Sequence, residues 1–214
     1  MHIVITGANR GIGQALMTRY QAAGHEVTGT ARQGGDLARL DVTDPDSVSA
    51  FAKSLGGRPV DLLICNAGVY MDKHETLTDG YPLHMWSESF ATNVTGVFLS
   101  VQALLPNLQA AQAPKIAIIS SQMASQTRAP GGSYVYRASK AAALNLGRNL
   151  AVDLAPSGIS VGIYHPGWVR TDMGGDEGDI SVEESVAGLL HEFDVLNTDT
   201  TGCFHTWDGR IHPY

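Results

Sequence analysis

Short apolar runs that alternate with amphipathic helical patterns constrain this chain more than any other feature of its sequence. Seven runs occur, at His2–Thr6, His25–Thr30, Leu37–Val42, Asp61–Cys65, Lys115–Ser120, Ile159–Tyr164 and Thr201–Thr206. Helical patterns lie between them, at Ile12–Ala23, Ser47–Leu55, Ser87–Leu105 and Ala138–Leu154. Strands that alternate with helices of this length indicate parallel βαβ units wound on both faces of one sheet. We therefore expect an α/β fold with a doubly wound, mainly parallel, seven-stranded sheet in a single domain over residues 1–214.

Local signals mark where several of these helices begin and end. Asp44-Pro45 combines a side chain that can accept hydrogen bonds from free helical N–H groups with a proline at the first helical position. Ser181 and Glu184 have the spacing of a capping box, which predicts a last helix after them. Pro106 is expected to help end the long helix in the middle of the chain.

Composition limits the classes of partner. The chain has 14 Lys plus Arg against 21 Asp plus Glu, a formal net charge of -7, so it lacks the basic footprint that nucleic acid or an anionic membrane would require. Cys65 and Cys203 are the two cysteines and do not form a disulfide framework. No basic leader or long apolar stretch is present at the start of the sequence. We therefore expect a cytoplasmic protein with no nucleic-acid or membrane partner.

A glycine-rich turn stands between the first strand and the first helix. Its sequence is Thr-Gly-Ala-Asn-Arg-Gly-Ile-Gly over residues 6–13. Glycines at such a turn let backbone N–H groups approach a pyrophosphate at a helix N-terminus. The spacing is Gly-xxx-Gly-x-Gly, which differs from the long dinucleotide-binding fingerprint Gly-x-Gly-x-x-Gly. The alternative is a turn that only permits tight packing of the helix on the strand.

Tyr136 and Lys140 stand four residues apart at the head of a predicted helix and therefore share one face. Phenols titrate near pKa ~10, and a nearby cation favours the phenolate, so the pair suits proton transfer near neutral pH. A surface Tyr–Lys pair without chemistry is the alternative. The eight histidines show neither a His-x-x-x-His nor a His-Glu-x-x-His pattern, so no metal site is expected.

Six segments together resemble the short-chain dehydrogenases/reductases of the classical type. They are the glycine turn, LDVTD at residues 40–44, Asn-Ala-Gly at residues 66–68, the ISS and YRASK segments, and the Pro-Gly-Trp-Val-Arg-Thr loop at residues 166–171. The stretch GGSYVYRASKAAALN is most similar to the C-factor-like and carbonyl-reductase-like members. The resemblance covers nearly the whole chain and implies a Rossmann-type fold that binds a dinucleotide.

The resemblance also implies catalytic roles. Tyr136 corresponds to the general acid that protonates a carbonyl oxygen, and Lys140 to the residue that lowers the pKa of that tyrosine and holds the nicotinamide ribose. Ser121 corresponds to the residue that hydrogen-bonds the substrate carbonyl, with Ser120 as the competing choice because neighbours on a strand face opposite ways. Asn93 corresponds to a structural asparagine that holds a water next to the lysine; a helix asparagine packed against backbone is the alternative.

NADP(H) is the cofactor that the resemblance implies. The expected cofactor contacts are Gly7, Asn9, Arg10, Gly11, Ile12, Gly13, Arg32, Asp41, Val42, Asn66, Ala67, Gly68, Tyr136, Lys140, Pro166, Gly167, Val169 and Thr171. No acid stands between Val27 and Gly35 to bind a ribose 2′-hydroxyl, and Arg32 and Arg10 are expected to contact a 2′-phosphate.

The predicted function is hydride transfer between the nicotinamide and a small-molecule carbonyl or alcohol substrate. An NADP(H)-binding sensor or signalling protein on the same fold is the alternative. The two long helices could form the seam of a homodimer or homotetramer. Two departures from the family pattern are Cys65 in place of an asparagine and the separation of fifteen positions between Ser121 and Tyr136.

Overall fold

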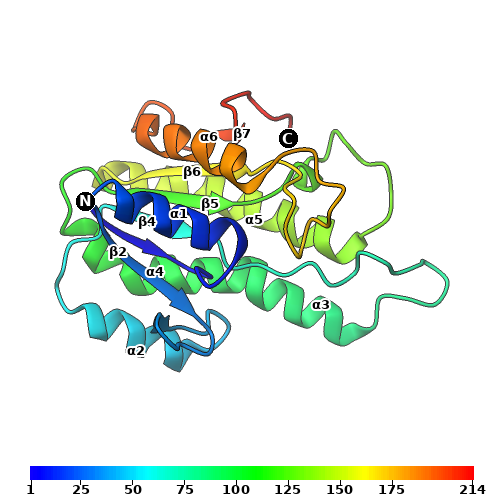
Figure 1. The fold of residues 1–214 in the computed structure, drawn as a ribbon, viewed down its shortest axis with the longest axis horizontal. Helices are drawn as coiled ribbons and strands as arrows, with labels where there is room; N and C mark the ends of the chain where they lie inside the picture. The colour runs from blue at the N-terminus through cyan, green and yellow to red at the C-terminus, as the bar shows by residue number, and fades with distance from the viewer.

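The computed structural model describes residues 1–214 as one seven-stranded sheet with helices on both faces (Figure 1). The strands are β1 (His2–Ile5), β2 (Glu26–Ala31), β3 (Ala38–Arg39), β4 (Leu62–Cys65), β5 (Lys115–Ile119), β6 (Ser160–His165) and β7 (Phe204–Thr206). Their order is β3-β2-β1-β4-β5-β6-β7, and every neighbouring pair is parallel. The predicted sheet is confirmed, and it is wholly parallel where a mainly parallel one was expected.

Two layers of helices cover the sheet because each strand alternates its side chains between the two faces. The helices α1 (Gly11–Ala22) and α6 (Val182–Val195) cover one face, where Ile5 and Phe193 belong to the same apolar cluster. On the other face, α2 (Pro45–Leu55), α4 (Gly96–Gln109) and α5 (Tyr134–Leu154) enclose a larger cluster that includes Leu63 and Val101. The two cores hold the strands rigidly enough for the loops at their ends to carry a site.

The predicted helix starts are present. The Asp44 carboxylate accepts a hydrogen bond of 3.0 Å from the Asp46 N–H, with Pro45 at the first position of α2. The capping box of α6 is complete, because Ser181 Oγ accepts from the Glu184 N–H and the Glu184 carboxylate accepts from the Ser181 N–H. Both helices therefore begin where their local sequence predicts.

The long central helix differs from its prediction. It consists of α3 (Leu83–Phe90), a π-helical turn over Ala91–Thr95, and α4, which continues to Gln109. Pro106 lies inside α4 and does not end it, so that prediction was wrong. The proline deprives the carbonyl of Gln102 of its partner, but Gln102 is exposed and water can bind that carbonyl.

The strand order reverses between β1 and β4, which is where an open parallel sheet of this kind forms its binding crevice. The segments after β4, β5 and β6 all leave the sheet at the same edge and lie at the right of Figure 1. None of the helices combines the length and hydropathy that crossing a membrane would need.

Candidate active site

A cleft of about 820 Å³ opens at this reversal of strand order. The predicted residues that line it are Gly7, Asn9, Arg10, Gly11, Ile12, Gly13, Arg32, Asp41, Val42, Asn66, Ala67, Gly68, Tyr136, Lys140, Pro166 and Thr171. The cleft therefore runs from the end of β2, across the glycine turn, to the first turns of α5.

The glycine turn forms the floor of the cleft and leaves no room for side chains. A Cβ on Gly13 would lie 2.3 Å from the Gly7 carbonyl oxygen and 2.4 Å from Asn66 Nδ2. Gly7 itself has a φ of +66°, a conformation that glycine adopts without strain. The Asn66 amide donates to the carbonyls of Thr6 and Gly7 at 3.1 and 2.8 Å, which ties the turn to the end of β4.

The N-terminus of α1 faces this floor without a side-chain cap. Arg10 occupies the N-cap position and makes no capping hydrogen bond, and no acidic residue stands in the first turn. The first N–H groups of a helix have no partner within the helix and attract anions through the helix dipole. The turn therefore offers unpaired donors where a pyrophosphate would lie.

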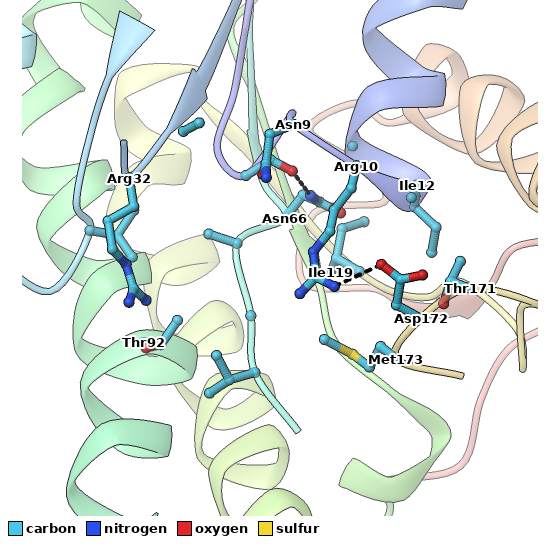
Figure 2. A pocket seen from close by; sticks show the side chains of 18 of the residues that line it. Asn9, Arg10, Ile12, Arg32, Asn66, Thr92, Ile119, Thr171, Asp172 and Met173 are labelled. Atoms are coloured by element: carbon cyan, nitrogen blue, oxygen red, sulfur yellow. Dashed lines mark hydrogen bonds and ion pairs between the residues drawn. The ribbon is translucent and has the colours of Figure 1, made fainter. Parts of the chain in front are cut away.

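The two arginines expected at a 2′-phosphate lie at different parts of the cleft (Figure 2). The Arg32 Nε lies 3.7 Å from the Asp41 carboxylate, and the Arg32 side chain is 61% exposed. Arg10 extends instead to Asp172, with 3.0 Å between Nη1 and Oδ2. Apart from its ion pair with Asp41, Arg32 makes no side-chain hydrogen bond at the end of β2, whereas Arg10 would have to leave Asp172 to reach a ligand there.

Tyr136 and Lys140 lie on the buried face of α5, with exposed fractions of 7% and 5%. Lys140 Nζ lies 5.7 Å from the centre of the Tyr136 ring and donates to the Ile119 carbonyl at 3.0 Å. The alternative of a surface pair is excluded by this burial. The two functional groups reach the cleft together, as their four-residue spacing predicts.

Burial shifts the pKa of both groups. It lowers the pKa of Lys140 to about 8, because the ammonium loses its hydration. Burial also raises the pKa of Tyr136 above its usual value; a hydrogen bond with Ser121 lowers it, and the charges of Tyr70 and Asp72 add to the rise. The expected shift of Tyr136 toward the phenolate is therefore absent, and the phenol keeps its proton at neutral pH.

The two serines after β5 point to different partners. Ser120 Oγ donates to the Lys140 carbonyl at 3.2 Å and lies beneath α5. Ser121 Oγ accepts from the Met123 N–H at 3.1 Å and is the serine hydrogen-bonded to the Tyr136 side chain. The geometry therefore favours Ser121 as the partner of the phenol, although Ser120 and not Ser121 lines the large cleft.

Asn93 lies in the π-helical turn and is 1% exposed. Its Oδ1 accepts from the Val69 N–H, and its Nδ2 donates to the Val69 carbonyl and to Ser139 Oγ, each at 2.9 Å. Isolated π turns inside α-helices often occur at functional sites. The asparagine thus joins the segment after β4 to α5 through direct contacts with protein atoms.

Sequence reasoning missed two residues that hold the start of α5. The Asp72 carboxylate, which is 1% exposed, accepts from the Val135 N–H at 2.8 Å and from the Tyr136 N–H at 3.2 Å. Tyr70 stacks on Tyr136 with 4.1 Å between ring centres, and its hydroxyl lies 2.6 Å from Ser133 Oγ. No local signal reveals these contacts because they span more than 60 positions of the chain.

Two predicted cofactor contacts lie outside the cleft. Val169 is 4% exposed and forms a bridge with Ile180, and Gly167 lines a separate cavity. Lining residues that were not predicted are Ala31, Gln33, Gly34, Leu40, Val69, Thr92, Ile119, Ser120, Arg170, Asp172, Met173 and Val182. Most of them adjoin a predicted residue in the sequence, so proximity to the motifs is the signal that could have found them.

Comparison with known proteins agrees with this geometry. The chain matches the model of the short chain dehydrogenase family over residues 1–180. It is 37% identical over 166 residues to the C-signal of Myxococcus xanthus, covering 77% of this chain and 99% of that protein. It is 31% identical over 226 aligned positions to 1-hydroxy-2-glutathionyl-2-methyl-3-butene dehydrogenase of Rhodococcus sp. (strain AD45), covering 98% and 97% of the two chains.

Among solved structures, the NADPH-bound carbonyl reductase from chicken fatty liver superimposes with a TM-score of 0.91. The two chains are 32% identical, and the match covers 100% of this chain and 98% of the chicken enzyme. These relatives confirm the resemblance to the C-factor-like and carbonyl-reductase-like members. By its family match and its relatives, the protein belongs to the short-chain dehydrogenase family.

Proposed function

We propose that this protein is an NADP(H)-dependent oxidoreductase that reduces a small carbonyl compound or oxidises the corresponding alcohol. The observation that carries the proposal is the buried group formed by Ser121, Tyr136 and Lys140 at one end of a dinucleotide-sized cleft. A cleft that only bound a dinucleotide would not need a protonated phenol beside a buried ammonium.

The cleft fits a dinucleotide by shape and by charge. The space above Gly13 admits no Cβ, so backbone donors can approach a pyrophosphate closely there. At the other end, Arg32 presents a guanidinium, and no acid between Val27 and Gly35 would repel a 2′-phosphate. The chicken carbonyl reductase binds NADPH in its structure. NADP(H) is therefore the cofactor that these residues fit best, and when bound it would donate the hydride in carbonyl reduction or accept it in alcohol oxidation.

The residues of the chain divide the remaining work. Tyr136 donates its proton to the carbonyl oxygen, which its raised pKa allows because the phenol stays protonated at neutral pH. Ser121 hydrogen-bonds the same oxygen, where negative charge develops. Lys140 binds the ribose and attracts the developing phenolate, and Asn93 fixes the backbone opposite α5. Alcohol oxidation uses the same groups with the proton moving in reverse.

The test is Tyr136→Phe, assayed by NADPH oxidation against a panel of carbonyl compounds. We expect kcat to fall by at least about 100-fold, the usual contribution of a general acid, with the affinity for NADPH near that of wild type. Tyr134→Phe is the matched control, because Tyr134 is on the same helix but is 39% exposed. Retention of most of the wild-type kcat in Tyr136→Phe would refute the assigned role.

An NADP(H)-binding signalling protein is the second candidate, and the relationship to the C-signal of Myxococcus xanthus is the observation that favours it. The same panel separates the two candidates. Tight NADPH binding without turnover of any carbonyl would favour signalling, whereas turnover that depends on Tyr136 favours the enzyme.

Location and assembly stay predictions. Cys65 and Cys203 are free thiols, and the cytoplasmic location expected from the sequence stays a prediction. A homodimer or homotetramer through the two long helical segments Ser87–Leu105 and Tyr136–Leu154 is proposed from the family resemblance, and sedimentation at several protein concentrations would test it.

A further inference from the structure

A second cavity, of about 300 Å³, lies next to the candidate active site and has no part in the chemistry proposed above. Its walls come from the turn after β5, the loop after β6 and the C-terminal segment. Gln122, which follows Ser121 in the chain, and Gly167, which follows Pro166, both line it. A molecule whose carbonyl lies beside Ser121 could therefore extend toward this cavity.

Two buried imidazoles line the cavity with nitrogens that have no hydrogen-bond partner. His165 is 8% exposed and His212 is 3% exposed, and their ring centres are 5.9 Å apart. His212 Nδ1 donates to the Pro213 carbonyl at 3.0 Å, which leaves its buried Nε2 unpaired. His165 Nδ1 is also buried and unpaired. Buried polar groups are rarely left without a partner, so these two nitrogens would be available to a ligand once the side chains that cover them move to admit it.

Two arginines surround the imidazoles with positive charge. Arg128 and Arg210 both line the cavity, and the charge of each lowers the pKa of both imidazoles. Only Arg210 has an acidic partner, Asp208, at 2.8 Å. Arg128 belongs to none of the ion pairs of the structure. Asp208 does not line the cavity, and Asp179, the one acid that does, is exposed. Arg128 therefore carries an uncompensated charge toward the cavity.

The imidazoles are neutral in the absence of a ligand. Burial lowers the pKa of His165 to about 3, and the charges of His212, Arg128 and Arg210 act in the same direction against that of Asp208. Burial also lowers the pKa of His212, as do both arginines, while its hydrogen bond to Pro213 opposes the shift. A bound anion would raise the pKa of a neighbouring imidazole, because a negative charge favours the protonated imidazolium.

We propose that this cavity is an anion subsite that receives a carboxylate or phosphate group. Arg128 donates to the anion, and His212 takes up a proton so that Nε2 also donates to it. No group of three or more His, Cys, Asp or Glu side chains with the geometry for a metal ion exists in the structure, so the unpaired nitrogens are assigned to an anion. This assignment rests on the proposed function: the anion is a group of the carbonyl substrate itself. The preferred class of substrate is therefore a keto acid or a phosphorylated carbonyl compound.

The first experiment measures anion binding without catalysis. Trp168 and Trp207 line the cavity, so inorganic phosphate and benzoate are titrated while tryptophan fluorescence is recorded, with calorimetry as a second readout. We expect Arg128→Met to weaken binding about tenfold or more, the loss expected for one charge-assisted contact. Arg19→Met, an exposed charge on α1, is the matched control and should bind as wild type does.

The binding of benzoate, which keeps its charge over this range, should tighten as the pH falls from 8 to 6, because the bound state holds one more proton, on His212. His212→Phe should abolish this pH dependence. Absence of phosphate and benzoate binding to the wild type, or equal binding in Arg128→Met and wild type, would overturn the proposal.

The second experiment identifies the source of the anion by comparing kcat/KM for a keto acid and its methyl ester. If the acid belongs to the substrate, wild type prefers the acid and Arg128→Met loses that preference while it reduces the ester normally. If the preference is unchanged in Arg128→Met although phosphate binding is lost, the site takes a free anion. If neither compound nor any carbonyl of the panel is reduced but phosphate binds, the anion site stands and the proposed oxidoreductase function fails.

Discussion

Asp72 should stabilise the helix that carries the proposed acid, and replacing it tests this directly. Its buried carboxylate accepts from the second and third N–H groups of α5, those of Val135 and Tyr136, at 2.8 and 3.2 Å. Ser133, the residue at the N-cap, has a φ of 47° and makes no side-chain capping bond. The cap of α5 is therefore supplied by a residue 63 positions away.

The cost of Asp72→Ala follows from these contacts. Loss of an ordinary N-cap costs about 0.5–2 kcal/mol, and a buried hydrogen bond to a charged group contributes about 1.5–3 kcal/mol, so we expect the loss of this buried, charged cap to cost about 3 kcal/mol. For a chain of this size about 1 kcal/mol corresponds to about 2–4 °C in Tm, which gives a decrease of roughly 6–12 °C. Asp72→Asn keeps one acceptor oxygen and should cost less than half as much.

Thermal unfolding followed by circular dichroism measures this effect. Asp79→Ala is the matched control, because Asp79 lies in the same loop and is exposed. The Asp72 carboxylate also raises the pKa of Tyr136, so Asp72→Asn should shift the pH profile of alcohol oxidation toward lower pH. A Tm of Asp72→Ala within a degree of that of Asp79→Ala would show that Asp72 does not cap α5.

Three other results are expected. Arg32→Asp should weaken NADPH binding by about ten- to a hundredfold with little effect on NADH binding, since one charge-assisted contact contributes ~1.5–3 kcal/mol. Titration of wild type and variant with both cofactors measures the two affinities. Equal affinities of the wild type for NADPH and NADH would contradict the role of Arg32. The kcat/KM for NADPH should fall above pH about 8, because burial lowers the pKa of Lys140 to about 8 and the side chain is neutral above that pH. A profile of kcat/KM that stays flat to pH 10 would refute the role of Lys140 in cofactor binding. Gly13→Ala should cost about 1–3 kcal/mol of stability and abolish cofactor binding, because its Cβ would lie 2.3 Å from the Gly7 carbonyl oxygen. Gly57→Ala is the control, because open space surrounds Gly57, and it should change neither property. Thermal unfolding and NADPH titration compare the two variants.

Much of the fold and the cofactor side of the site follows from local sequence. The seven apolar runs coincide with the seven strands within a few residues, because a buried parallel strand needs a short apolar segment wherever it lies in the sheet. The glycine turn is local for the same kind of reason, since backbone conformation and the lack of a Cβ belong to the residues themselves. The pairing of Tyr136 with Lys140 needs only the periodicity of one helix.

The tertiary structure alone decided which distant groups meet. Asp72 caps α5 from 63 positions away, and Arg10 reaches Asp172 across 162 positions instead of lying free for a ligand. The neighbouring serines after β5 have the same local sequence signal, and only the packing of α5 against the sheet separates their partners. The unpaired His165 and His212 meet because β6 and the C-terminal segment pack together. Such contacts leave no pattern along the chain, since they depend on how whole strands and helices pack and not on the spacing of neighbouring residues.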